Sequence, residues 1–296
     1  MQKIILDCDP GMDDALAIIA GLADKNINIL GITTVAGNVE LTHTTQNTLN
    51  LLKYLDHDID VYSGIDKPLL RDLNTATEFH GETGMGDIEL PSSVKKISNE
   101  YAEFYLKYAK EFPQEIELVA VGPLTNIAGA LIKYPKLKDL LKGITIMGGS
   151  LCGGNITPHA EFNIYVDPEA ANIVFNSGLE IKMIGLDATM KGYFAANELE
   201  EIREFNSKYS KATMEIFDAM FRVRGKIGMT NVVFHDTIAL ISAVYKDPFK
   251  FQEKIILVET DEKRGETVEH FQGNKILVAV DFNKEWFKNY LIKILK

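Results

Sequence analysis

Four carboxylates fall close together near the start of the chain, in the stretch ILDCDPGMDDALAI (residues 5–18). Asp7 and Asp9 end an apolar, strand-like run, whereas Asp13 and Asp14 begin a helical pattern after a Pro-Gly turn. The helix dipole favours acids in a first helical turn, which explains Asp13 or Asp14 but not the pair in the strand. Carboxylates this crowded repel one another and become protonated unless a cation lies among them. The stretch therefore predicts a metal or catalytic site.

The donor atoms of this stretch indicate which cation would bind. Alternation along a strand turns Asp7 and Asp9 to one side and Cys8 to the other, so the available donors are oxygens. Oxygen ligands favour a hard cation, Ca²⁺ or Mg²⁺, and the spacing is not that of an EF-hand loop. Ligands of a parallel sheet bind beyond the carboxyl ends of its strands, which is where these acids are expected to lie.

Polar residues follow other apolar runs as well. Asn38 follows the second run, and a Gly-Pro turn that can expose backbone carbonyls follows the run at 116–122. Late in the chain, His235 and Asp236 stand between an apolar run and a helical pattern. Taken alone this pair is a weak signal, because a lone histidine is usually structural and Asp236 could be a helix N-cap.

A Gly-rich loop, SLCGGNITPHAEFNIYVDPEA (residues 150–170), contains Asn155, Glu161 and Asn163. It offers amide and carboxylate groups but no Lys or Arg, which suits a ligand rich in hydroxyl groups better than a phosphate. A surface loop with helix caps explains Glu161 and Asn163 equally well on pattern alone. Asp167, which precedes a proline, is assigned as a helix N-cap only.

The elements that would position these residues alternate between strands and helices. Continuous Ile, Val and Leu runs between helical patterns predict a parallel sheet covered on both faces. The expected strands are 3–9, 27–37, 61–64, 116–122, 143–149, 180–189, 254–260, 266–271 and 275–282. The expected helices are 11–24, 40–55, 99–112, 124–134, 167–178 and 283–295, with a mostly helical region at 195–245. We predict one α/β domain (1–296) with a mostly parallel, Rossmann-like central sheet, a helical insertion and extra C-terminal strands.

Charge and composition argue against several classes of protein. The 296 residues carry a formal net charge of −11, which disfavours nucleic acid as a partner and favours a small polar ligand or a cation. No run approaches the ~20 apolar residues that span a bilayer, and the start has no apolar signal stretch, so no membrane partner is expected. The two cysteines, Cys8 and Cys152, lie far apart, which fits a cytoplasmic protein.

Taken together, the motifs resemble those of the inosine–uridine-preferring nucleoside hydrolases. They are DCDPGMDDA at 7–15, GN at 37–38, VGPLTNIA at 121–128, MGG at 147–149 continuing through GN, AEFN and DPEAA, and HD at 235–236. They occur in the family's order over most of the chain. The resemblance implies a Ca²⁺-dependent enzyme that hydrolyses the N-glycosidic bond of ribonucleosides to ribose and free base. It also implies a role in purine and pyrimidine nucleoside catabolism and salvage, and a homodimer or homotetramer.

The resemblance assigns metal-binding and catalytic roles. Asp9, Asp14 and Asp236 match the carboxylates that hold the calcium, and the main-chain carbonyl of Val121 matches a further ligand. Relatives often carry Thr at that last position, but a backbone oxygen is indifferent to the side chain, so the ligand is expected to persist. Asp9 also matches the base that deprotonates a calcium-bound water. His235 matches a histidine that assists the departing base.

The resemblance also assigns residues that bind the nucleoside. Those that match ribose-binding positions are Asp13, Asn155, Glu161 and Asn163, those that line the sugar are Asn38 and Met147, and His80 and Phe162 complete the substrate site, with His80 against the base. Relatives often place Tyr or Gln in the helix before the HD motif to cover the base. The corresponding segment here, FRVRGKIGMTNVVFHD (221–236), contains no Tyr. The residues that cover the base are therefore not predicted.

The expected mechanism is direct attack of water on the sugar. Glycosidic cleavage passes through an oxocarbenium-like state, which a partly neutralised cluster of carboxylates stabilises. Asp9 takes a proton from the water, and His235 has a suitable intrinsic pKa to donate one to the base. Asp7 is expected to orient its neighbours.

Two other classes of function remain open on the residues alone. A haloacid-dehalogenase-like phosphatase also begins with Asp-x-Asp, with Asp7 as nucleophile and Asp9 as acid, but its motif normally continues with Thr or Val. A non-catalytic, calcium-dependent nucleoside- or sugar-binding protein would need the ribose-binding residues but not both Asp9 and His235. The sequence does not predict which base is preferred.

Overall fold

A nine-stranded mixed sheet forms the centre of the fold, and the computed structural model describes it together with all of residues 1–296. The strands are β1 (Gln2–Cys8), β2 (Ile27–Thr34), β3 (Val61–Ser63), β4 (Ile116–Ala120), β5 (Gly143–Met147), β6 (Ile181–Ile184), β9 (Phe249–Val258), β10 (Thr267–Glu269) and β11 (Lys275–Phe282). Their order is β10-β9-β11-β6-β5-β4-β1-β2-β3. Neighbours from β3 to β11 pair in parallel, and β9 and β10 form an antiparallel edge.

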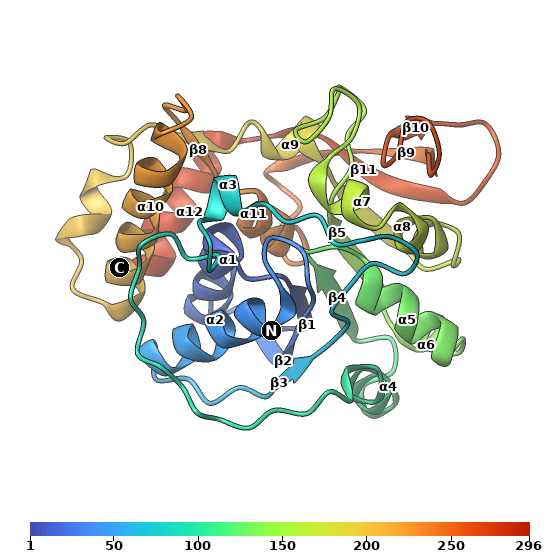
Figure 1. Cartoon of the computed structure of the whole chain (residues 1–296), viewed down its shortest axis with the longest axis horizontal. Coiled ribbons are helices and arrows are strands. Elements are labelled where there is room, and N and C mark those ends of the chain that lie inside the picture. The colour runs from blue at the N-terminus through green and yellow to red at the C-terminus, as the bar shows by residue number, and fades with distance from the viewer.

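Helices cover both faces of the sheet. They are α1 (Met12–Ala23), α2 (Leu41–Tyr54), α3 (Thr77–His80), α4 (Tyr101–Glu111), α5 (Thr125–Lys133), α6 (Leu137–Leu140), α7 (Phe162–Val166), α8 (Pro168–Phe175), α9 (Leu186–Thr189), α10 (Lys208–Gly225), α11 (His235–Ser242) and α12 (Lys284–Leu295), with a 3₁₀ helix η1 (Glu200–Glu204). One apolar core joins the sheet to α1, α2, α10, α11 and α12, and a second joins it to α4, α5, α6 and α8. Figure 1 shows these two groups on opposite sides of the strands. The predicted α/β fold is confirmed.

Burial explains why the central strands are continuous apolar runs. Every residue of β4 and β5 is buried, and so is every residue of β1 after its first two. A strand covered by helices on both faces has no solvent side, so the alternation of polar and apolar residues disappears.

The strand order creates the crevice that holds the site. β1 lies between β2 and β4, so the chain proceeds from β1 to β3 on one side and from β4 to β6 on the other. Connections on the two sides leave in opposite directions, which opens a crevice at the carboxyl ends of the strands. The segments that follow β1, β2, β4 and β5 meet in that crevice.

Most predicted elements are found, and most strands are shorter than predicted. The exceptions are β11, which has the predicted bounds, and β9, which begins at Phe249 rather than at residue 254. The strand predicted at 180–189 is wrong in its second half, because β6 ends at Ile184 and α9 follows. There the backbone N–H of Leu186 donates to the carbonyl oxygen of Gly149 at 3.0 Å, which turns the chain out of the sheet. The predicted strand at 3–9 ends at Cys8, so Asp9 lies just beyond the sheet.

The region predicted as mostly helical, 195–245, contains η1, α10 and α11 and borders a small second sheet. That sheet pairs β7 (Tyr193–Phe194) with β8 (Val232–Val233) in antiparallel fashion. α1 packs against both α10 and α11, which brings the late part of the chain against the first helix (Figure 1). None of the helices combines the length and apolar character needed to cross a bilayer.

Candidate active site

A cavity of about 210 Å³ opens at the carboxyl ends of the central strands. Eleven of the residues that the sequence assigned to the site line it: Asp13, Asn38, His80, Val121, Met147, Asn155, Glu161, Phe162, Asn163, His235 and Asp236. They come from segments spread over more than two hundred positions of the chain. The remaining two, Asp9 and Asp14, are fully buried next to residues of this lining.

Asp9 is held between two glycines. Its Oδ2 accepts the backbone N–H of Asn38 at 2.7 Å, and its Oδ1 is buried without any hydrogen-bond partner. A Cβ atom on Gly122 would lie 2.6 Å from Oδ1, and one on Gly37 would collide with Oδ2. Both positions must therefore be glycine for the backbone to come so close to the carboxylate.

Asp14 is fixed by three donors. The backbone N–H groups of Asp9 and Gly11 donate to it at 3.0 and 3.1 Å, and Asn38 Nδ2 donates to its Oδ2 at 3.0 Å. Asn38 Nδ2 also lies 3.1 Å from the carbonyl oxygen of Asp9. Asn38 therefore holds the two acids next to each other.

Asp13 turns to the other side of the first helical turn. Its Oδ2 accepts the backbone N–H of His235 at 3.1 Å, and its Oδ1 is buried without a partner. The contact ties the start of α1 to the start of α11 and brings Asp236, which is 5% exposed, to the cavity wall.

The pKa values of these acids are raised above their usual range. Burial is the largest cause for each of them. It raises the pKa of Asp13 to about 7, and neighbouring carboxylates raise the pKa of Asp9 and Asp236 further. The protein itself does not supply enough positive charge to balance this cluster.

The donor atoms present fit a hard cation, but the side chains alone do not form a complete set of ligands. The donors are oxygens, and one oxygen of Asp9 and one of Asp13 have no partner. No group of three or more His, Cys, Asp or Glu side chains is close enough to hold a metal ion by itself. A carbonyl oxygen such as that of Val121, which lines the cavity, would have to complete the ligand set.

The loop after β5 presents its polar groups to the cavity in a fixed arrangement. Glu161 caps α7, because its carboxylate accepts the backbone N–H groups of Asn163, Ile164 and Gly149 at 2.9, 3.1 and 3.0 Å. Burial raises the pKa of Glu161 to about 7, although these three donors oppose the shift. Asn155 Oδ1 accepts the N–H of Phe162 at 2.9 Å.

Asn163 connects two strand ends. Its Nδ2 donates to the carbonyl oxygens of Val121 and Met147 at 2.8 and 3.1 Å. These residues follow and end β4 and β5, respectively. The amide thereby fixes the backbone carbonyl that the sequence assigned as a metal ligand, and a carbonyl oxygen retains a second lone pair for a cation.

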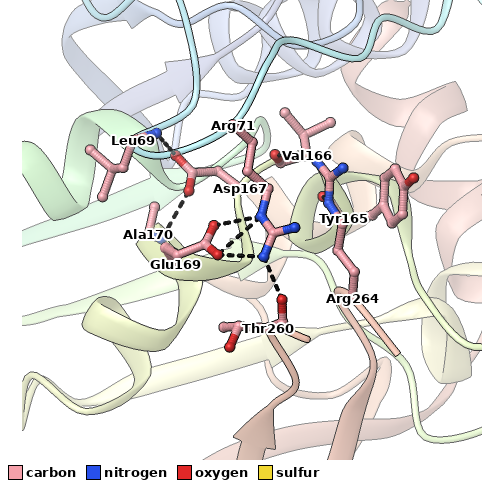
Figure 2. A network of polar contacts seen from close by, with 9 residues as sticks. All are labelled: Leu69, Arg71, Tyr165, Val166, Asp167, Glu169, Ala170, Thr260 and Arg264. Atoms are coloured by element: carbon pink, nitrogen blue, oxygen red, sulfur yellow. Dashed lines mark hydrogen bonds and ion pairs between the residues drawn. The ribbon is translucent and has the colours of Figure 1, made fainter. Parts of the chain in front are cut away.

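A polar network outside the cavity anchors this loop (Figure 2). Asp167 caps α8 through the N–H of Ala170 at 3.0 Å, as predicted, and it also accepts the N–H of Leu69 at 2.9 Å. Arg71 binds Glu169 through two nitrogens. The network joins segment 69–71 to the start of α8, which directly follows the segment that carries Glu161 and Asn163.

Two histidines line the cavity next to the first turn of α1. His80 Nδ1 accepts the backbone N–H of Met12 at 3.1 Å, so its Nε2 carries the ring proton and can donate to a ligand. His235 Nδ1 lies 2.8 Å from Thr189 Oγ1. Burial, and next to it the charge of Arg224, lowers the pKa of both histidines to about 3. Both rings are therefore neutral at neutral pH, a form that the sequence did not predict for His235.

Several cavity residues were missed by the sequence analysis. They are Ala76, Phe79, Ile156, Met190, Arg224, Met229 and Val233. Most are apolar and have no chemical signature. Arg224 had one, because it follows Phe217 and Met220 at helical spacing on the buried face of α10. A charged residue at an apolar position of an amphipathic helix indicates a special role.

Asp7 does not reach the cavity. Its Oδ2 accepts hydrogen bonds from Thr33 Oγ1 at 2.5 Å, Tyr105 OH at 2.7 Å and Asn126 Nδ2 at 2.7 Å. Its carbonyl oxygen accepts the N–H of Val121 at 2.8 Å. Asp7 thus ties β1 to β2, α4 and α5 and contacts the turn after β4 through its carbonyl oxygen.

The whole chain matches one known family. The model of the inosine-uridine preferring nucleoside hydrolases matches residues 4–289. Among curated proteins, the chain is 40% identical to the pyrimidine-specific ribonucleoside hydrolase RihA of Salmonella arizonae, an alignment that covers 99% of this chain and 98% of the relative. It is 38% identical to RihA of Escherichia coli, with the same coverage.

Solved structures of nucleoside hydrolases also superimpose on this chain. The plant nucleoside hydrolase PpNRh1 superimposes with a TM-score of 0.93 at 30% identity, over 99% of this chain and 98% of that one. The purine-preferring ribonucleoside hydrolase from Gardnerella vaginalis superimposes with a TM-score of 0.93 at 31% identity and the same coverage. These matches favour the hydrolase over the phosphatase and the non-catalytic binding protein.

Proposed function

The chain belongs to the inosine-uridine preferring nucleoside hydrolase family, and from that premise we propose how its cavity cleaves the N-glycosidic bond of a ribonucleoside to ribose and free base. The observation that carries this proposal is the unpartnered Oδ1 of Asp9, buried beside a cavity lined by ten further polar or sugar-lining residues of the expected set and by Val121. A buried carboxylate oxygen without a partner is costly, which supports a ligand there in the working enzyme.

We propose that Ca²⁺ binds to Asp9, Asp14 and Asp236 together with the carbonyl oxygen of Val121, and that the three carboxylates draw closer together around it than they lie in this structure. The raised pKa values of these acids and their oxygen-only chemistry support a hard divalent cation. Such a cation lowers the pKa of a water molecule and orients neighbouring hydroxyl groups. The negative charge of these carboxylates also stabilises the positive charge that the sugar develops in the transition state.

Asp9 is the group that accepts a proton from the attacking water. Its Oδ2 is occupied by the N–H of Asn38, while Oδ1 has a free lone pair and lies next to the Val121–Gly122 turn. A general base positioned in this way contributes about 10²–10⁴-fold to a rate.

The ribose hydroxyls are bound by the acids and amides on the sugar side. Asp13 offers its unpartnered Oδ1, and Asn155, Glu161 and Asn163 line the same cavity. Because backbone donors already fix Glu161, it can accept a hydroxyl proton without changing its position. Preorganised acceptors of this kind orient the sugar for attack.

The base lies against the histidine side of the cavity. His80 can donate from Nε2, and His235 can assist the leaving base through whichever ring nitrogen carries its proton. Phe79, Met190 and Met229 supply apolar surface for the flat ring. Since the curated relatives are named pyrimidine-specific, we propose uridine and cytidine as the preferred substrates.

Ribose release from a panel of nucleosides tests the function. Purified protein is incubated with uridine, cytidine, inosine and adenosine in the presence of Ca²⁺, and free ribose is measured as reducing sugar. We expect release from uridine or cytidine at the highest rate and none from Asp9→Asn. Release of phosphate from nucleotides without release of ribose from nucleosides would contradict the proposal.

We further propose that the enzyme acts in nucleoside salvage in the cytoplasm as a homodimer or homotetramer. Both cysteines are free, and one of them, Cys152, is exposed, which is compatible with a reducing compartment. Light scattering coupled to size-exclusion chromatography gives the oligomeric state directly, and a monomer at micromolar concentration would contradict the assembly.

A further inference from the structure

Arg224 is the only Lys or Arg side chain that lines the cavity. It stands in the last turn of α10 and is 6% exposed. Its Nε is buried without a hydrogen-bond partner, and its guanidinium takes part in no hydrogen bond or ion pair of the protein. A permanent cation is therefore buried at the site with its donors unused.

The other arginines of the chain behave differently. Arg203 and Arg222 form ion pairs with Asp218 and Asp87, and Arg71 pairs with Glu169. Arg264 donates to the carbonyl oxygens of Tyr165 and Val166. Burying a charged group without a partner is costly. Because Arg224 is the one arginine without a partner and it lines the cavity, we infer that a ligand accepts its hydrogen bonds.

The surroundings of Arg224 keep its charge and place it between the acids assigned to the sugar and the metal and the histidines assigned to the base. Burial lowers the pKa of Arg224, while Asp13 and Asp236 raise it, and a guanidinium stays protonated at any working pH. The charge of Arg224 also acts on His80 and His235, the two residues assigned to the base. One cavity thus contains both the carboxylates, which stabilise a positively charged sugar, and the Arg224 cation, which stabilises a negatively charged base.

We propose that Arg224 binds the nucleobase and stabilises the negative charge that develops on it as the glycosidic bond breaks, an inference that rests on the proposed hydrolysis of ribonucleosides. The electron pair of the bond between C1′ and nitrogen goes to the base. The oxygen of water bonds to C1′, and Asp9 takes one proton of that water. The base leaves as an anion to which His235 donates a hydrogen bond, and solvent then supplies its proton.

The hydrogen-bond donors of a guanidinium determine which class of base it can bind and stabilise. Its planar N–H donors suit a carbonyl oxygen onto which the anion's charge is spread, as in uracil or hypoxanthine. Because Arg224 is 6% exposed, such a donor is worth more there than in water.

The test compares leaving groups. Uridine has a poor leaving group and depends on stabilisation of the anion, whereas p-nitrophenyl riboside releases a stable phenolate. We expect Arg224→Gln to lower kcat/KM for uridine by about 10²–10³-fold and for p-nitrophenyl riboside by about tenfold or less. The matched control is Arg222→Gln, which lies on the same helix but pairs with the exposed Asp87, and both of its rates should equal those of the parent enzyme.

A second variant covers the case in which Arg224→Gln does not fold. Arg224→Lys keeps the charge but not the planar fork, so its loss on uridine should be smaller but still exceed its loss on p-nitrophenyl riboside. Equal losses on the two substrates in either variant would overturn the role of Arg224 and leave the hydrolase intact. A parent enzyme that releases no ribose from any nucleoside would overturn the proposed function and this role with it.

Discussion

The carboxylate of Asp13 accepts the backbone N–H of His235 at 3.1 Å, across 222 positions of sequence. This one contact joins the acid-rich first turn of α1 to the start of α11 and so sets the distance between the early carboxylates and Asp236. It also leaves Asp13 Oδ1 without a partner inside the protein. The predictions below concern the groups that this contact brings together.

Asp9→Asn should reduce the turnover of uridine by about 10²–10⁴-fold, because an amide cannot take the proton of the attacking water. The fold should persist, since the change removes a buried charge that burial and Asp14 disfavour. Ribose release and the melting temperature in EDTA measure the two effects. Asp66→Asn, at an exposed position, is the control and should alter neither. Near-parental turnover of Asp9→Asn would reject the base assignment.

His235→Ala should impair uridine more than p-nitrophenyl riboside, because the histidine assists only a leaving group that needs a donor. The expected loss of kcat on uridine is about 10²-fold or more. Thr189→Val, which removes the hydroxyl at 2.8 Å from Nδ1, should give a smaller loss of the same kind. Steady-state kinetics on both substrates measure these losses of kcat. Losses of equal size on the two substrates would contradict a role of His235 in assisting the leaving group.

Calcium should stabilise the protein more at pH 8 than at pH 5. The pKa of Asp13 is raised to about 7 and those of Asp9, Asp14 and Asp236 are raised as well, so the metal-free folded state binds more protons than the unfolded chain. These acids therefore lower the unfolding free energy of the metal-free protein as pH rises from about 4 through 7. A cation must displace those protons, so it binds more tightly at the higher pH.

The measurement is the difference in unfolding free energy with Ca²⁺ and with EDTA at each pH. A cation at a hundredfold excess over its Kd adds about 2.7 kcal/mol. Neutral His80, whose pKa is lowered to about 3, destabilises the folded state below pH 6.5. It does so with and without the metal, so its contribution cancels in the difference. An equal gain at both pH values would contradict the prediction.

Gly122→Ala should reduce activity strongly while the protein still folds. The new Cβ would lie 2.6 Å from Asp9 Oδ1, so the carboxylate would have to move away from the cavity. A displacement of this size at a reacting group costs about 10²-fold in rate. Gly225→Ala is a matched control, because a Cβ there meets nothing within 4 Å. Full activity of Gly122→Ala would show that the position of Asp9 is not critical.

Glu161→Gln should lower stability by about 1–3 kcal/mol, because an amide nitrogen in place of one oxygen cannot accept the N–H groups it faces. Glu161 Oε2 accepts from Gly149 and Ile164, whereas Oε1 accepts only from Asn163. Urea unfolding measures the loss, and KM for uridine should rise with it because the ribose loop loosens. A variant as stable as the parent would mean that these donors find other partners.

The sequence by itself determined the fold class and indicated the strand ends at which a site would form. Periodicity alone showed buried strands alternating with helices, and polar residues at the ends of those strands had to converge at one edge of a parallel sheet. This rule requires only the residue at which each strand ends, and the pattern of neighbouring residues indicates that position. It therefore indicated Asn38 and the turns that follow the runs at 116–122 and 143–149, whereas the resemblance to the family singled out Val121 and Met147. The structure places all three residues around one cavity.

The tertiary structure decided the partners of each group. The three donors of Asp7 come from β2, α4 and α5, and nothing in the spacing of the sequence indicates that these side chains meet. The protonated nitrogen of His80 follows from a contact with Met12, 68 positions away. The helical spacing of Arg224 after Phe217 and Met220 indicates a buried position, but only the structure shows that its Nε has no hydrogen-bond partner there. Such contacts depend on how whole elements pack across the chain, so a pattern confined to neighbouring residues cannot contain them.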